Sequence, residues 1–512
     1  MDKLKALLCA AFALVATNAR ADDTGRWQRA ESPHFIVYGD VGEFKLREAV
    51  RTLEMFDAEL RHLLTAAPPP SANKLEVFLF RNQSRLRQVW PSAGSAVLGF
   101  YTANRDLIAA FATYGENAAL EGQEVLFHEY AHHFMLQSTT VPYPAWYVEG
   151  FAEYVQTIRF ESQRAVIGDF SRGRAQDILS SEWPPIEEFL NPDRSRWTTL
   201  REVRFYAESW VATHYLMDEP ARMAQFQAYL AAINHGQDPV RAFEPNFGAT
   251  PRDFERALHQ YARGAIPRRA SSLPNVDLSS LQVTPLPRSA DDLLLLDARM
   301  RRGVETDDRA DVARRVEEIA ARYPDDAFAQ RARARALLLR GAYPEARTLL
   351  ATLTAADPRD IDALFLLGMS YIYEAMPMPR TDAAARTARA AFAAQGRRYF
   401  ARAFRLNARH VPTLYAYATT YMMADGPIPD DALDVLLRAY DLAPQVSEIG
   451  LNTARNLMEH DRFDEATAIL RPIAFSPHGQ GASATARAML DAAEKHVVPR
   501  GEELDRNDDS GG

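Results

Sequence analysis

The chain has 512 residues, of which 47% are hydrophobic and 25% charged, the composition of an ordinary soluble globular protein. Because one hydrophobic core stops growing well below this length, a single domain is not expected. The formal net charge of −9, without a basic face carrying interleaved aromatic residues, argues against nucleic acid or anionic membrane surfaces as main partners.

Residues 1–21 have the features of a secretory signal peptide. Two lysines precede an apolar run over residues 6–17, and Ala19 and Ala21 are small residues at a cleavage point. This run is too short to span a bilayer comfortably, and no stretch of about 18 apolar residues follows it, so no membrane insertion is expected after cleavage. We expect a periplasmic or secreted protein that begins near Asp22.

The cysteine content restricts the chemistry of the mature chain. The single cysteine, Cys9, lies inside the apolar run and is removed with it. Cysteine catalysis, disulfides and cysteine-ligated metal are therefore excluded. Cleavage also moves the formal charge to about −11, so the mature protein is acidic.

The first part of the mature chain is typical of a small mixed α/β lobe. Strands are expected at His34–Tyr38 and Lys74–Leu79, with an amphipathic helix over Glu43–Leu64 between them. The segments Ala96–Tyr101 and Leu107–Phe111 predict a hairpin.

From Ala118 to Arg263 the pattern is helical almost continuously, which predicts a helical second lobe. Residues 264–290 are rich in proline and serine, and we expect them to form a linker. We therefore expect residues 22–263 to fold as one two-lobed domain without the rest of the chain.

Residues 291–497 contain an internal repeat. Pro324 and Pro358 are 34 residues apart, and each closes a helical hairpin pattern, which predicts an all-α domain of tetratricopeptide-like repeats. About twenty extra residues, around 376–389, lengthen one repeat. Such stacking usually forms a concave surface for a protein partner. Residues 498–512 are expected to be a disordered tail.

The segment His128-Glu129-Tyr130-Ala131-His132 lies within the expected second lobe. The two histidines are four residues apart on a helix, so both imidazoles can reach one metal ion. Glu129 is offset by one position and can reach a metal-bound water without binding the metal. This division of roles suits a hydrolytic zinc site.

A catalytic zinc ion needs a third protein ligand, and Glu149 lies seventeen positions after His132 in a second expected helix, Ala145–Thr157. Glu153 lies one turn further on the same face, where it would accept a hydrogen bond from a ligating histidine. His133 points away from His132 around the helix and is expected to be structural.

Through His128–His132 and Glu149-Gly150-Phe151-Ala152 the sequence resembles the gluzincin metallopeptidases, the thermolysin-like and aminopeptidase N-like group. The resemblance covers about residues 30–263. It implies one zinc ion per chain bound by His128, His132 and Glu149, with Glu129 as general base. It also implies an edge strand beside the site, at residues 98–104 or 106–113. The amine-binding motif Gly-x-Met-Glu-Asn of the aminopeptidase N-like enzymes is absent.

The resemblance further implies an oxyanion donor on a downstream helix. We expect Tyr206 to be this donor, with His214 as the competing candidate. A tyrosine packed in a helical core is the structural alternative.

The expected fold is an α+β zincin-like two-lobed metallopeptidase domain followed by the all-α repeat domain, and the expected function is peptide-bond hydrolysis on a peptide or protein substrate. One alternative is a scaffold in which the repeats bind a partner and the zinc domain has little turnover. Another is a zinc hydrolase acting on a non-peptide amide, such as a cell-wall bond.

Overall fold

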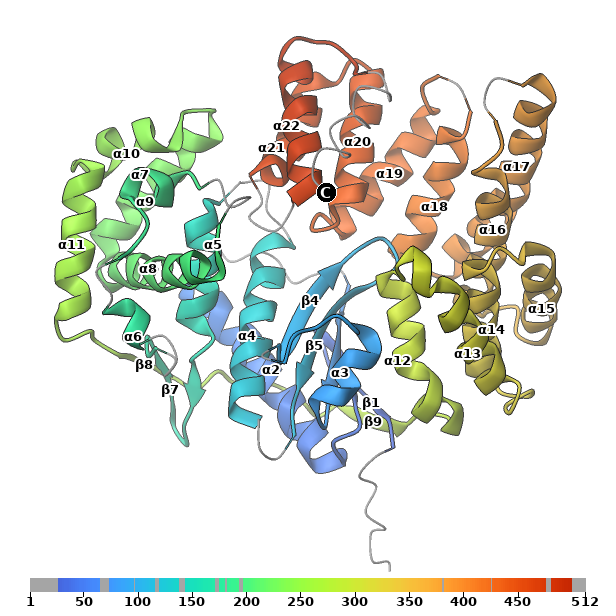
Figure 1. Cartoon of the computed structure of the whole chain (residues 1–512), viewed down its shortest axis with the longest axis horizontal. Coiled ribbons are helices and arrows are strands. Elements are labelled where there is room, and N and C mark those ends of the chain that lie inside the picture. The colour runs from blue at the N-terminus through green and yellow to red at the C-terminus, as the bar shows by residue number, and fades with distance from the viewer. Residues whose placement is uncertain are drawn as a thin grey trace, which may run out of the picture.

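Figure 1 shows the computed structural model as three regions: a central sheet in blue, a group of green helices on one side, and an array of yellow to red helices that extends around the sheet. The structure describes residues 26–64, 73–95, 97–115, 119–137, 143–170, 175–179, 182–192, 197–379, 382–424, 426–475 and 480–499. The expected signal peptide lies outside these residues, as does the expected tail from residue 500 onward. In the described part of the chain, no helix combines the length and apolarity needed to cross a bilayer.

A six-stranded mixed sheet forms the centre of the first region, in the order β4-β5-β3-β2-β1-β9. Its middle strands β2, β3 and β5 are parallel, whereas β4, β1 and β9 each pair antiparallel. The expected strands and hairpin are confirmed, and the hairpin is β4–β5. The strand bounds are β1 Gln28–Glu31, β2 Phe35–Gly39, β3 Leu75–Phe80, β4 Gly99–Ala103, β5 Ile108–Thr113 and β9 Gln282–Pro285.

Helices cover both faces of this sheet. On one face, α2 (Glu43–Leu63) and α4 (Ala119–Leu136) bury apolar side chains against inward-facing residues such as Val37 and Val77. On the other face, α3 (Gln83–Val89) and α12 (Arg288–Arg302) pack against Phe78 and Phe111. Helix α12 is therefore part of the sheet's core, although it follows the expected linker.

The second region is mainly helical. Helix α8 (Thr199–Asp218) packs against α5, α9 and α11. The prediction of continuous helix is wrong over residues 159–167, because β6 and β7 form a small antiparallel sheet there with β8. The remaining bounds are α5 Ala145–Val155, α6 Ala175–Ile178, α7 Ile186–Leu190, α9 Pro220–Asn234, α10 Pro239–Phe247, α11 Pro251–Arg263, β6 Arg159–Phe160, β7 Arg164–Ile167 and β8 Arg269–Ser272.

The segment expected to be a linker is structured at both ends. Strand β8 pairs with β7 of the second region, and β9 pairs with β1 at the edge of the central sheet. Proline and serine allowed these extended strands because edge strands leave one side of the backbone unpaired. The expected domain boundary at residue 263 is therefore wrong, since residues 264–302 complete both sheets and one face of the core.

The third region consists of antiparallel helix pairs, as expected for a tetratricopeptide-like array. The helices that follow Pro324 and Pro358 are α14 and α16, and each packs against the next helix in the chain. The bounds are α13 Arg309–Ala320, α14 Ala327–Leu339, α15 Tyr343–Ala356, α16 Ile361–Ala375, α17 Ala383–Leu406, α18 Val411–Met422, α19 Asp430–Leu442, α20 Ser447–Glu459, α21 Phe463–Ala474 and α22 Gln480–Glu494.

Two details of the array agree with the sequence. A Cβ on Gly368 would lie 2.4 Å from Phe400 Cε1, so the small residue lets α16 and α17 approach closely, as helices of such a repeat must. The extra residues lengthen the repeat that contains α17, a helix of 24 residues.

Candidate metal centre

Helix α4 is held in place by contacts on two sides. The Tyr130 hydroxyl donates a 2.6 Å hydrogen bond to Asp57 Oδ1 of α2, and Arg61 donates to the same carboxylate. On the strand side, a Cβ on Gly99 would lie 2.7 Å from Val125 Cγ1, so glycine lets β4 come close to α4. The helix therefore lies against the terminal strand of the sheet.

His128 and His132 of α4 and Glu149 of α5 bring their side chains together. The two Nε2 atoms are 3.0 Å apart, and Glu149 Oε2 lies 3.8 Å from His128 Nε2 and 3.5 Å from His132 Nε2. Glu149 is fully buried and His132 is 4% exposed, whereas His128 is partly exposed.

These three residues fit a zinc ion in spacing and in chemistry. Zinc binds histidine nitrogen and carboxylate oxygen at roughly 2.0–2.2 Å, so a tetrahedral arrangement separates its ligand atoms by roughly 3.4 Å. One donor atom from each residue lies within 4.8 Å of the other two, and the measured separations lie on both sides of that tetrahedral value. With three protein donors, a fourth position remains for water or substrate.

Glu129 lies next to this cluster and faces strand β4. Burial, followed by the negative charge of Glu149, raises the pKa of Glu129 to about 8, and a hydrogen bond from the backbone N–H of Tyr101 opposes that rise. A carboxylate with a raised pKa is a stronger base than an ordinary glutamate. The residue is therefore suited to proton transfer.

Tyr101 of β4 connects the edge strand to α4 a second time. Its hydroxyl shares a 3.1 Å hydrogen bond with His133 Nδ1. Burial lowers the pKa of His133 to about 4, so this histidine is neutral. The arrangement agrees with the expected structural role of His133. Of the two segments considered as the edge strand, residues 98–104 contain the terminal strand, and residues 106–113 contain the internal strand β5.

Helix α5 packs against α8 through Gly150, the residue after Glu149. A Cβ there would lie 2.2 Å from the Ser209 carbonyl oxygen and 2.3 Å from Thr213 Oγ1. Only glycine permits this approach, which fixes the position of Glu149. Glu153, one turn further, is buried and accepts a 2.6 Å hydrogen bond from Gln156 Nε2.

The two candidate oxyanion donors lie on α8. Tyr206 is partly buried, and its ring centroid is 6.2 Å from that of Phe205. Both ring nitrogens of His214 have structural partners: Nδ1 lies 2.9 Å from the Tyr261 hydroxyl and Nε2 lies 3.2 Å from the Gly168 carbonyl oxygen. These contacts argue against His214 as the donor.

Sequence reasoning missed the contacts of Tyr101 with Glu129 and His133, and it missed a contact from the repeats. Burial raises the pKa of Tyr101 well above its usual value, and the Gln445 side chain, in the α19–α20 connection, opposes that rise. No local pattern marks such a pairing. The only available signal was an aromatic residue within the expected edge strand.

No protein-family model matches the chain, and no curated protein matches it. Among solved structures, a thermophilic TPR protein of Thermus thermophilus aligns at 21% identity with a TM-score of 0.31, over 36% of this chain and 90% of that chain. The repeats are defined by their helix pairs and their 34-residue spacing.

Proposed function

We propose that the chain is an exported, gluzincin-type zinc metallopeptidase. The observation that carries this proposal is the convergence of His128, His132 and Glu149 within 4.8 Å, with Glu129 on the next position of the same helix. The three ligand residues would hold the metal. The signal-peptide pattern of residues 1–21 supports a periplasmic or secreted location.

Bound zinc would supply Lewis acidity, which polarises a peptide carbonyl and acidifies water. Glu129 accepts a proton from the attacking water and delivers it to the leaving amine. Tyr206 is the proposed donor to the oxygen that gains negative charge.

An extended peptide is the substrate class that the edge strand favours. Strand β4 is the last strand of its sheet, so its outer backbone edge has no strand partner among the described residues. A peptide can pair with such an edge by main-chain hydrogen bonds.

A scaffold with a weakly active zinc domain is the second candidate. The repeats contact both other regions: Asn73 Nδ2 donates to the Leu442 carbonyl oxygen, and Arg471 donates to that of Asn234. Such contacts would hold the repeats in place, which also suits a protein whose main task is to present its repeat surface to a partner.

Metal analysis combined with a peptide-library cleavage profile tests the proposal. We expect one zinc per wild-type chain, and zinc loss in His128→Ala, His132→Ala and Glu149→Ala. Glu129→Gln should keep the zinc and lose hydrolysis. Glu121→Gln, an exposed position on the same helix, is the matched control and should retain both.

Two other results would contradict the ligand assignment or the peptidase activity. Full zinc occupancy in Glu149→Ala would refute the ligand assignment and make Glu153 the next candidate. Zinc binding with no cleavage of any peptide would favour the scaffold or a non-peptide amide as substrate.

A further inference from the structure

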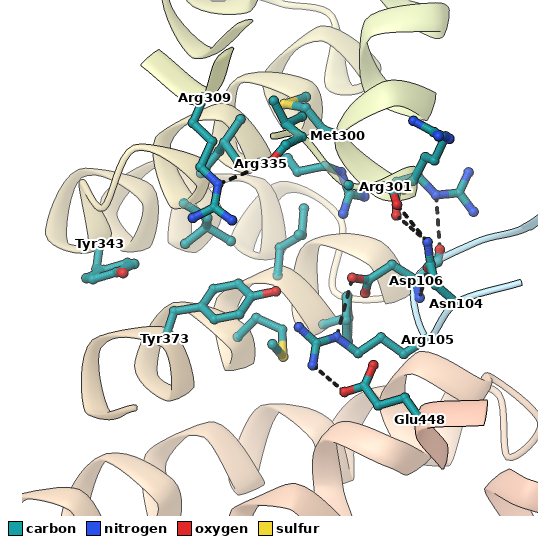
Figure 2. A pocket seen from close by; sticks show the side chains of 18 residues that line it. Asn104, Arg105, Asp106, Met300, Arg301, Arg309, Arg335, Tyr343, Tyr373 and Glu448 are labelled. Carbon is teal, nitrogen blue, oxygen red and sulfur yellow. Dashed lines mark hydrogen bonds and ion pairs between the residues drawn. The ribbon is translucent and has the colours of Figure 1, made fainter. Parts of the chain in front are cut away.

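A cavity of about 590 Å³ lies where three parts of the chain meet, away from the candidate zinc ligands. Its walls come from the β4–β5 hairpin tip at residues 104–106, the end of α12, and the repeat helices α14 and α16 (Figure 2). This volume lies within the range of about 300–1,000 Å³ typical of ligand sites.

Positive charge predominates on the walls, which carry five arginines and two carboxylates. Three of the arginines have carboxylate partners: Arg105 pairs with Glu448 at 2.8 Å, Arg301 forms a two-pronged pair with Glu76, and Arg335 pairs with Asp297. These pairs fix the walls and join the hairpin tip to the repeats.

The other two arginines, Arg302 and Arg309, have no carboxylate within ion-pair distance among the described residues. The Arg302 guanidinium lies 5.2 Å from the Trp90 ring centroid and 5.5 Å from that of Phe100. Arg309 donates from Nε to the Val304 carbonyl oxygen at 3.2 Å, which leaves its two terminal nitrogens for another acceptor. Figure 2 shows this guanidinium directed toward the part of the cavity that contains Tyr343 and Tyr373.

The remaining wall is apolar. Leu338, Phe365, Leu366 and Met369 are buried side chains of α14 and α16 that border the cavity. An inorganic anion would pair with the arginines but would leave this apolar surface exposed to water. A peptide with a carboxylate next to an apolar side chain would satisfy both surfaces.

We propose that this cavity binds an acidic peptide segment, with a carboxylate on Arg309 and a neighbouring apolar side chain against α14 and α16. The carboxylate can come from an internal glutamate or from a chain terminus. Binding at this site does not depend on hydrolysis.

Fluorescence anisotropy of labelled peptides tests the proposal, with full-length Glu129→Gln protein so that the probes are not cleaved. The probes are a blocked Leu-Glu-Leu peptide, its Leu-Gln-Leu counterpart, and a neutral peptide with a free C-terminal carboxylate. A lost charge-assisted hydrogen bond should weaken binding by at least about tenfold, so the glutamine probe should bind that much more weakly.

In the same background, Arg309→Gln should reduce affinity for the Leu-Glu-Leu probe toward that of the Leu-Gln-Leu probe. Arg314→Gln is the matched control, because it lies on the same helix as Arg309 and forms its ion pairs outside the cavity. Circular dichroism checks that each variant folds, and the comparison of the glutamate and glutamine probes decides the outcome if Arg309→Gln fails to fold.

The proposal is overturned if the glutamate and glutamine probes bind equally, if neither binds at millimolar concentration, or if Arg309→Gln binds like the control. Equal displacement of the probe by inorganic phosphate would overturn the peptide assignment. Tighter binding of the free C-terminal carboxylate than of the internal glutamate would identify a chain terminus as the source.

Discussion

At the scale of single residues, the candidate zinc site brings together His128 and His132 from α4 and Glu149 from α5. The spacing of His128, His132 and Glu149 follows from helix geometry, and the structure brings their donor atoms together. The hydrogen bond between Tyr101 and His133 depends on how a strand packs on a helix, which spacing along the chain does not encode. Contacts between a strand and a helix that are distant in the chain, such as this one, could not be predicted from the sequence.

Glu208 leads to a prediction about pH and stability. This carboxylate is fully buried on α8, and neither oxygen has a hydrogen-bond partner among the described residues. Burial, followed by the charge of Glu255, raises its pKa well above the usual value. The folded state thus keeps the proton at pH values where the unfolded state has lost it, so stability falls as pH rises above the ordinary glutamate range.

We expect Glu208→Gln to remove this pH dependence. The melting temperature of the variant should exceed that of the wild type by an amount that grows from pH 5 to pH 8. Glu244→Gln, an exposed position on α10, is the control and should follow the wild type. A difference that stays constant with pH would show that Glu208 has the same charge in both states.

Tyr206→Phe tests the proposed oxyanion donor. The change removes one oxygen and little volume, so zinc content and melting temperature should stay near wild type. Loss of one such donor typically lowers kcat by about 100- to 1,000-fold. Near-wild-type turnover with zinc bound would make Tyr206 structural.

At the scale of elements, long periodic segments were predictable and short strands were not. Helices α2 and α5 begin where their patterns predicted and end within two residues of the expected positions. Strands β8 and β9 have four residues each and lie in a proline- and serine-rich segment, where no alternation of apolar residues is visible. Helix α12 has apolar side chains on two sides, one packed on the sheet and the other on α13. The spacing of these apolar residues predicts a buried helix but does not show which elements cover it.

Gly150→Ala tests whether helix packing positions Glu149. Alanine favours an isolated helix by about 1 kcal/mol over glycine, but overpacking a close contact typically costs about 1–3 kcal/mol. The obstructing atoms include the Ser209 backbone, which cannot easily move. We therefore expect the cost of the clash to exceed the gain in helix propensity, which gives a lower melting temperature and weaker zinc binding.

The control is Gly94→Ala, where an added Cβ would meet nothing within 4 Å. It should leave both measurements unchanged. Stronger zinc binding in Gly150→Ala would contradict the proposed role of the α5–α8 contact.

At the scale of the whole molecule, the repeats and the rest of the chain form one interlocked structure. Helix α12 buries one side in the sheet core and the other in the first repeat helices. We therefore expect a fragment of residues 22–263 to lack cooperative unfolding and near-ultraviolet circular dichroism, because it lacks β8, β9 and α12.

Full-length protein is the reference for this comparison and should unfold cooperatively. A soluble fragment of residues 22–263 with a sharp thermal transition would show that the missing strands and helix are dispensable. Peptide cleavage by that fragment would have the same meaning.

The pairing of Gln28 with Pro285 also has a consequence for biosynthesis. At about 5–20 residues per second, the ribosome needs roughly 13 to 51 seconds after adding residue 28 to add residue 285. Until β9 is made, the outer edge of β1 has no partner, and an open strand edge can pair with another nascent chain. The yield of folded protein should therefore fall as more chains are synthesised at the same time, because intermolecular pairing then competes with the arrival of β9.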